Sequence, residues 1–93
     1  MTMKQRIESK LTQAFAPERL EIVDESDQHA GHAGHRPGGE THFRVDIVAA
    51  AFEGETRVAR QRRVYQVLAE ELADRVHALA LSTRTPEEAR RAH

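Results

Sequence analysis

The stretch HFRVDIVA, residues 42–49, decides the fold that this sequence predicts. In it Phe43, Val45 and Ile47 alternate with polar or charged side chains, which is the period of a strand with one buried face. Such a strand needs neighbours on both sides and a helical layer over its apolar face before the apolar side chains can leave water. The remaining sequence supplies these elements in a recognisable order.

Helical and strand patterns alternate on both sides of residues 42–49. A capping-box pattern at Thr2 opens an amphipathic helix that Pro17 ends. The order we expect is a helix at 3–15, a strand at 19–24, the strand at 42–49, a helix between Gly54 and about residue 73, a strand at 75–83, and a short helix at 86–93 that should fray. In the second helix the predicted apolar stripe consists of Val58, Tyr65, Leu68 and Leu72, with Val64 on its edge and the polar Gln61 in its middle.

These elements predict an α+β fold with the order α-β-β-α-β. The first two strands follow each other directly and should be antiparallel, whereas a crossover helix makes the second and third parallel. The result is a three-stranded mixed sheet with both main helices on one face. Ninety-three residues leave room for a single domain, 1–93, with one core.

Composition excludes several classes of function. The chain has no cysteine, so it can form neither disulfides nor thiolate metal sites of its own. Its net charge of −1 is unlike that of a strongly basic nucleic-acid binder. There is no apolar run of the ~20 residues that a membrane span needs and no signal-peptide pattern, so we expect a cytoplasmic protein. The sequence also lacks a nucleophile elbow, a phosphate-cradling glycine loop and a cofactor fingerprint, which argues against an enzyme.

Six histidines in so short a chain are its most unusual feature. Three of them, His29, His32 and His35, recur at every third position inside residues 25–41, a His/Gly-rich stretch that we expect to be a flexible loop. In such a loop three imidazoles can converge on one metal ion, or they can simply be solvated. His77, at the start of the third strand, shares parity with the apolar residues of that strand and is placed at the rim of the sheet. His42 has the opposite parity to Phe43 and is expected on the surface.

Four arginines crowd into seven residues at the start of the second helix. On a helical wheel Arg57, Arg60 and Arg63 fan across the solvent-facing side, while Arg62 lies elsewhere. This cluster could bind phosphates or an acidic partner, and it could equally be a solvated face balanced by nearby acids. Basic residues at a helix N-terminus oppose the helix dipole, which favours a functional reason for them.

Several blocks of sequence together resemble the BolA family. In order, they are Gly39-Glu40-Thr41-His42-Phe43-Arg44-Val45, Phe52-Glu53-Gly54, Val58 with Arg60, Arg62 and Val64, Leu68-Ala69-Glu70-Glu71-Leu72, Val76-His77-Ala78-Leu79-Ala80-Leu81, and Thr85-Pro86-Glu87-Glu88. They cover about residues 20–88. The resemblance implies a fold related to the class II KH domain, which agrees with the order predicted above. Gln61 and Ala89 depart from the family pattern, which has a histidine and an aromatic residue at these positions.

The resemblance implies a partner rather than a reaction. BolA-like proteins pair with monothiol glutaredoxins and share a bridging [2Fe-2S] cluster that glutathione also helps to hold. By this resemblance His77 is one ligand and a loop histidine is the second: His29, with His32 and His35 as alternatives. The family's other role is DNA binding and transcriptional regulation, for which Arg57, Arg60 and Arg63 are candidates. Alone, the chain is expected to be a monomer or a weak homodimer, with no membrane partner.

Overall fold

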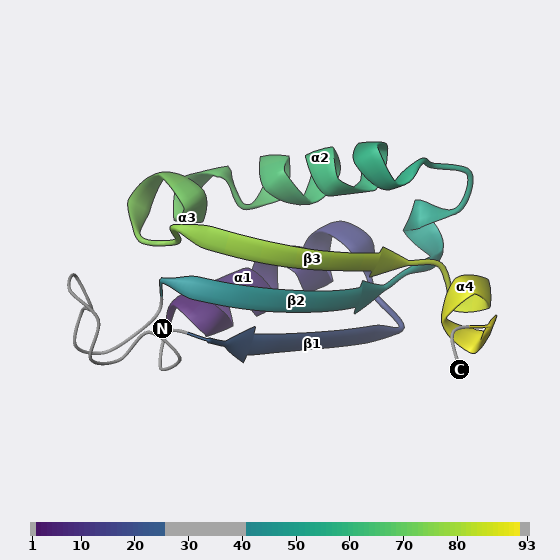
Figure 1. Ribbon diagram of the computed structural model, residues 1–93, viewed down its shortest axis with the longest axis horizontal. Coiled ribbons are helices and arrows are strands. Elements are labelled where there is room, and N and C mark those ends of the chain that lie inside the picture. The colour runs from purple at the N-terminus through teal and green to yellow at the C-terminus, as the bar shows by residue number, and fades with distance from the viewer. Residues whose placement is uncertain (1, 26–40, 92–93) are drawn as a thin grey trace.

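The computed structural model describes residues 2–25 and 41–91 and has an α+β fold (Figure 1). The elements are α1 (Met3–Phe15), β1 (Arg19–Asp24), β2 (His42–Val48), the 3-10 helix η2 (Ala50–Phe52), α2 (Arg57–Val67), α3 (Ala69–Asp74), β3 (Ala78–Arg84) and α4 (Pro86–Arg91). The predicted order α-β-β-α-β is therefore confirmed, with η2 and the separate α3 as additions.

The three strands form one mixed sheet in the order β1-β2-β3. β1 and β2 are antiparallel and β2 and β3 are parallel, so that Ile22, Val45 and Leu81 lie opposite one another across the sheet. Figure 1 shows α1 and α2 on the same side of this sheet, while the face toward the viewer carries no helix over most of its area. Both predictions, the strand directions and the one-sided helical layer, are confirmed.

The core lies between the sheet and the helices. From α1 it takes Ile7, Leu11 and Phe15, which recur every fourth residue and are all almost completely buried. Phe15 packs against Phe52 of η2 with their ring centroids 5.0 Å apart. The capping box holds the start of α1: the Thr2 side chain accepts a hydrogen bond from the backbone of Gln5, whose own side chain accepts one from the Thr2 backbone.

The second helix differs from the prediction in two ways. It is interrupted at Leu68, whose φ of −101° and ψ of 18° end α2 and begin α3. The predicted apolar stripe is wrong at Val58 and Tyr65, which are 57% and 42% exposed, but right at Leu68, which is buried, and at Leu72, which packs against the core. The buried row of α2 is instead Arg60, Val64 and Leu68, spaced four residues apart. An arginine thus occupies a core-facing position at which hydrophobic periodicity cannot find it.

The third strand starts later than predicted. Residues 75–77 connect α3 to β3, which begins at Ala78. The Val76 N–H donates to the carbonyl of Glu71 and closes α3, while the His77 N–H donates to the carbonyl of Thr41 over 2.8 Å. Because strand parity does not extend back to His77, its side chain is exposed and does not follow the half-buried Leu79. At the other end the strand runs to Arg84, one residue beyond the prediction.

The structure fixes both ends of the predicted loop at residues 25–41. The Glu25 N–H donates to the carbonyl of His42 over 2.7 Å, and Thr41 is buried beneath the start of β3. His29, His32 and His35 lie outside the described residues, so the predicted flexibility of this segment stays a prediction. The last two residues of the chain also lie outside the described residues, so the predicted fraying of the final helix stays a prediction. The helix α4 itself spans 86–91.

Candidate functional site

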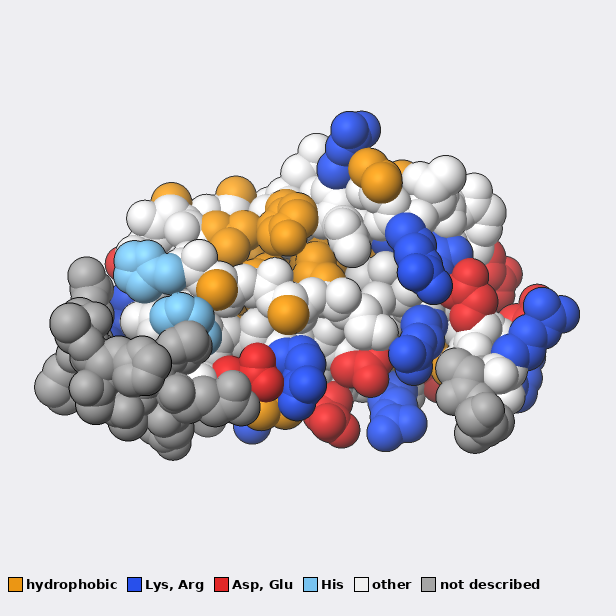
Figure 2. Space-filling view, in the orientation of Figure 1, with side chains coloured by type: hydrophobic (Ala, Val, Ile, Leu, Met, Phe, Trp, Pro, Cys, Tyr) orange, Lys and Arg blue, Asp and Glu red, His pale blue; other side chains and the backbone are white. Residues whose placement is uncertain are grey.

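Two histidines lie together at the end of the sheet where β2 and β3 begin. His42 is the first residue of β2 and stands opposite Ala78, the first residue of β3. The carbonyl of Thr41 accepts hydrogen bonds from the backbone of both His77 and Ala78, which fixes the two chain segments side by side. His42 and His77 are the histidines of the described part of the chain, and Figure 2 shows histidine side chains adjacent to each other at this end.

The environments of the two imidazoles differ. The His77 side chain is exposed, so both ring nitrogens can be approached from solvent. His42 is half-buried, and its Nδ1 lies 2.9 Å from the hydroxyl of the buried Thr41. A hydrogen bond at Nδ1 orients the ring and leaves Nε2 as the nitrogen for a ligand or a proton. The prediction that His42 is an uninvolved surface residue therefore missed its contact with Thr41 and its closeness to His77.

The two imidazoles do not by themselves make up a metal site. Imidazole is a good ligand for iron and zinc, but within residues 2–25 and 41–91 no cluster of three or more His, Cys, Asp or Glu side chains could hold a metal ion. Further ligands would have to come from the loop histidines, which lie outside the described residues, or from a partner. The arrangement suits a surface that contributes part of a coordination sphere.

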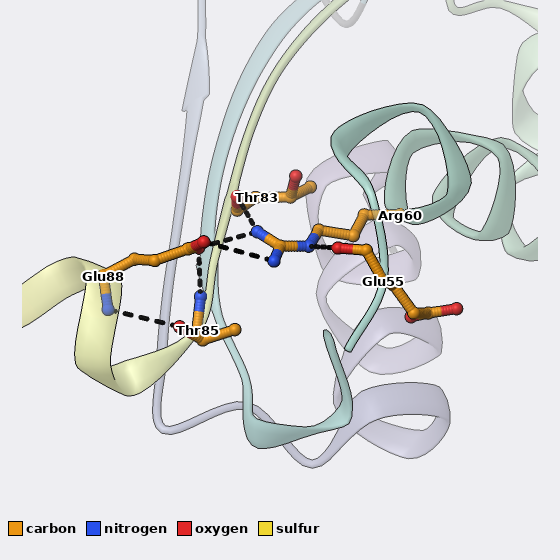
Figure 3. Close-up of polar contacts among 5 residues, drawn as sticks. All are labelled: Glu55, Arg60, Thr83, Thr85 and Glu88. Carbon is orange, nitrogen blue, oxygen red and sulfur yellow. Dashed lines mark hydrogen bonds and ion pairs between the residues drawn. The ribbon is translucent and has the colours of Figure 1, made fainter. Parts of the chain in front are cut away.

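The predicted arginine face is divided by the structure. Arg60 does not point to solvent: it is 5% exposed, and its guanidinium group donates to Glu88 over 2.6 and 3.2 Å (Figure 3). It also donates to the backbone carbonyls of Glu55 and Thr83, over 3.0 and 3.2 Å. These contacts connect α2, β3 and α4, so Arg60 acts as a structural cation rather than as part of an open basic patch.

The other two arginines of that set, Arg63 and Arg57, differ in their contacts. Arg63 donates to the Glu55 carboxylate over 2.6 Å and to the carbonyl of Ala51 over 3.1 Å. Its guanidinium carbon lies 5.0 Å from the centroid of the Phe15 ring, a cation–π contact. Arg57 is exposed, and no carboxylate within the described residues forms an ion pair with it. The prediction of three solvent-facing arginines is therefore wrong, and Arg57 is the member that stays available.

Comparison with known proteins agrees with the fold and with the sequence blocks. The family model described as BolA-like protein matches residues 11–88. The chain belongs to the BolA family. Among solved structures, BolA1 from Arabidopsis thaliana superposes with a TM-score of 0.83 at 41% identity, covering 95% of this chain and 96% of that one. The resemblance that the sequence blocks indicated is confirmed.

Two curated relatives show how far the similarity extends. The DNA-binding transcriptional regulator BolA of Escherichia coli is 49% identical over 88 residues, which are 95% of this chain and 80% of the relative. BolA-like protein 1 of Pongo abelii is 51% identical over 80 residues, which are 86% of this chain but 56% of the relative. The chain thus spans little more than half of that longer protein. Within the described residues no helix is long and apolar enough to cross a membrane.

Proposed function

We propose that this protein binds a monothiol glutaredoxin and completes a [2Fe-2S] cluster that glutathione and the glutaredoxin also hold. One observation carries the proposal: His77 is exposed beside His42 at the end of the sheet, next to the two fixed ends of the His-rich segment. His77 would be one ligand. A loop histidine, His29 or in its place His32 or His35, would be the second. The protein would act in cluster trafficking or iron regulation and not as an enzyme.

The residues present fit half of such a site. A chain without cysteine cannot supply the thiolates of a cluster by itself. Two imidazoles can, however, provide the remaining ligands of a [2Fe-2S] cluster to which a partner contributes two thiolates. When bound, a cluster with imidazole on one iron has a higher reduction potential than one with thiolates alone. Because protons compete with iron for an imidazole ligand, imidazole ligands in general also make a shared cluster easier to release in mildly acidic conditions.

The test is to mix the protein with a cluster-loaded monothiol glutaredoxin and follow visible absorption and circular dichroism. We expect a new spectrum at equimolar ratio with the natural sequence and with His93→Ala, which removes a histidine from the end of the chain. His77→Ala should abolish it. Since the His77 side chain is exposed, that variant should unfold at the same denaturant concentration as the natural protein. An unchanged spectrum and cluster lifetime in His77→Ala would refute the assignment.

The second ligand needs its own pair of variants. We expect His29→Ala to weaken the bridged spectrum more than His42→Ala does, because the family resemblance assigns the second ligand to the segment between β1 and β2, which contains His29. If His32 or His35 can replace His29 as the second ligand, all three loop histidines must be changed to alanine before the bridged spectrum is lost completely. The reverse ranking, with His42→Ala abolishing the spectrum and the triple loop variant retaining it, would assign the second ligand to His42.

DNA binding is the second candidate function, since a relative of 49% identity is named as a DNA-binding transcriptional regulator. The exposed Arg57 favours it, whereas Arg60 and Arg63 are held in internal ion pairs. Binding through phosphates predicts an affinity that falls steeply as salt is added. Fluorescence anisotropy with a labelled duplex at several salt concentrations measures that slope, and a slope near zero would remove this candidate.

A further inference from the structure

A polar hollow lies between α2 and the end of β3, away from the histidines. Two α2 residues, Arg57 and Gln61, line one side of it, and the β3 residues 81–84 line the other. Gln61 is the residue that stood out in the sequence as a polar side chain in an expected apolar stripe. Figure 2 shows Lys and Arg side chains gathered toward the α4 end of the open sheet face, where β3 ends.

Hydrogen-bond donors from two elements face this hollow. Arg57 and Gln61 are four residues apart and therefore lie on the same side of α2. On β3, Ser82 and Arg84 alternate with the buried Thr83, so they belong to the open face of the sheet. Two guanidinium groups, one amide and one hydroxyl thus line a single depression.

The positive charge of this hollow is not balanced by an acidic side chain in its lining. None of its lining residues is acidic. Within the described part of the chain neither Arg57 nor Arg84 forms an ion pair, in contrast to Arg60 and Arg63. Arg57 does contribute to the low pKa of Glu88, but Arg60 already donates to both oxygens of that carboxylate. Two arginines that line one depression, neither of them held in an ion pair, repel each other, which favours an external anion.

The surroundings limit the size of that anion. A neighbouring depression on the open face shares Ser82 and Arg84 but is also lined by two carboxylates, Glu21 and Asp46, together with Val23 and Arg44. These two carboxylates stand opposite each other on β1 and β2, and Asp46 stands opposite Ser82. Arg44 on that side is already paired with Glu25 over 3.3 Å, so the two carboxylates disfavour an anion there, whereas no residue that lines the α2 side is acidic. The site therefore fits one compact anionic group.

We propose that this hollow binds a phosphate group, held by the side chains of Arg57 and Arg84 and by the polar atoms of Gln61 and Ser82. Guanidinium groups bind phosphate through paired hydrogen bonds. A phosphate presents its oxygens in several directions, so it can accept hydrogen bonds from two elements at once more readily than a planar carboxylate can. The phosphate can belong to a nucleic-acid backbone or to a small molecule. The proposal does not rest on the cluster site, because Ser82 follows His77 by five residues, a path of about 17 Å along the strand.

The test is a titration of isotope-labelled protein with inorganic phosphate at neutral pH and constant ionic strength, followed by amide chemical shifts. We expect saturable shifts at residues 57–61 and 82–84. Arg57→Gln and Arg84→Gln should each weaken binding about tenfold, the loss of one charge-assisted hydrogen-bonded contact. Arg62→Gln is the matched control, since Arg62 is exposed on the same helix but does not line the hollow. Far-ultraviolet circular dichroism checks that all three variants fold.

Three results would overturn the proposal: shifts that do not saturate, an equal loss in Arg62→Gln, or acetate binding as tightly as phosphate. A parallel arm with a short DNA duplex identifies the source of the phosphate. If the duplex displaces inorganic phosphate and its salt slope falls by about one in Arg84→Gln, the phosphate is that of a nucleic-acid backbone. If the duplex does not compete while phosphate still saturates the hollow, the ligand is a small phosphate compound. In either case the site is retained, and cluster binding with glutaredoxin is judged separately.

Discussion

Glu71 is a buried carboxylate that joins α3 to two cations of α1. Its carboxylate is completely buried between α3 and α1, where it accepts hydrogen bonds from Arg6 over 2.9 Å and from Lys10 over 3.0 Å. Both cations keep about one third of their side-chain surface exposed, and they compensate a carboxylate charge that has left water. The interruption at Leu68 places this carboxylate on α3, packed against α1, and not on a continuation of α2.

Glu71 makes stability depend on acid. Burial by itself raises the pKa of the carboxyl group, but hydrogen bonds from Lys10, from its own backbone and from Arg6 outweigh burial, so the pKa lies below the ordinary value of 4.5. A lowered folded-state pKa means that the unfolded chain takes up the proton first. The stabilisation is therefore complete above pH 4.5 and is lost as the pH falls through the lower folded-state value.

We expect Glu71→Gln to lower the free energy of unfolding at neutral pH by about 1–3 kcal/mol, because two charge-assisted hydrogen bonds lose their charge. The difference from the natural protein should shrink as the pH falls below 4.5. Urea denaturation at a series of pH values measures both effects. Glu70→Gln is the control, since Glu70 is on the same helix but its side chain is 82% exposed. A pH-independent difference would contradict a role for the Glu71 charge.

At the scale of elements, α4 is held to the rest of the fold by one carboxylate. Glu88 caps its own helix: it accepts a hydrogen bond from the Thr85 backbone, while the Thr85 hydroxyl accepts one from the Glu88 backbone. The same carboxylate accepts two hydrogen bonds from Arg60 of α2 (Figure 3). The hydrogen bond from Arg60, followed by that from Thr85, lowers the pKa of Glu88 to about 2. Its contribution is therefore present above pH 4.5 and is lost toward pH 2.

We expect Arg60→Ala to destabilise the fold by about 2–4 kcal/mol, because a buried cation and its contacts to three elements are removed together. Glu88→Gln should act in the same direction but less, since it keeps the shape and the cap. Hydrogen exchange of the α4 amides should quicken in both variants before that of the sheet. If α4 stays protected in Arg60→Ala, the ion pair does not anchor the helix.

The buried row of α2 can be tested with two valines of the same helix. Val64→Ala removes apolar atoms from a fully buried position and should cost about 2 kcal/mol. Val58→Ala makes the same chemical change at a site that is 57% exposed, and its cost should stay below about 0.5 kcal/mol. Thermal and denaturant unfolding compare the two. Equal losses would support the apolar stripe that the sequence predicted and contradict the packing of α2 described here.

The contrast between α1 and α2 shows what periodicity can and cannot predict. In α1 the buried residues are all apolar, and the cap is a local pattern, so the bounds 3–15 follow from the sequence. In α2 the core-facing row begins with Arg60, whose partner Glu88 lies 28 residues further along the chain. Such a distant pair leaves no local signal. The same applies to His42, whose place beside the residues that precede β3 depends on the pairing of β2 with β3, whereas the strand pattern already placed His77 at the rim of the sheet.

For the whole molecule, the two candidate sites lie at opposite ends of one sheet. The histidines stand where β2 and β3 begin, and the phosphate hollow lies where β3 ends. Between them the open face carries charges of both signs, namely Glu21, Asp46 and Arg44. The protein can therefore offer two partners different surfaces at the same time. Variants at one end should leave binding at the other unchanged, because they share neither a side chain nor a helix.

Both ends of the sheet depend on a core with a small free energy of unfolding. A chain of 93 residues has a free energy of unfolding of about 5–14 kcal/mol at the usual stability per residue. Phe52 is completely buried in η2, the turn that joins β2 to α2, and it contacts Phe15 of α1. It therefore connects the layer of helices to the end of the sheet near the arginines.

We expect Phe52→Ala to cost about 3–5 kcal/mol, a large part of the whole stability, because the cavity lies among side chains of several elements. Removing Phe15 as well should cost less than the sum of the single losses, by about 0.5–1.5 kcal/mol, since the ring pair is lost only once. Urea unfolding of the double-mutant cycle measures this, with an unchanged dependence on denaturant as the check for two-state behaviour. Strict additivity would show that the two rings stabilise the fold independently, and η2 would then not couple the helices to the sheet.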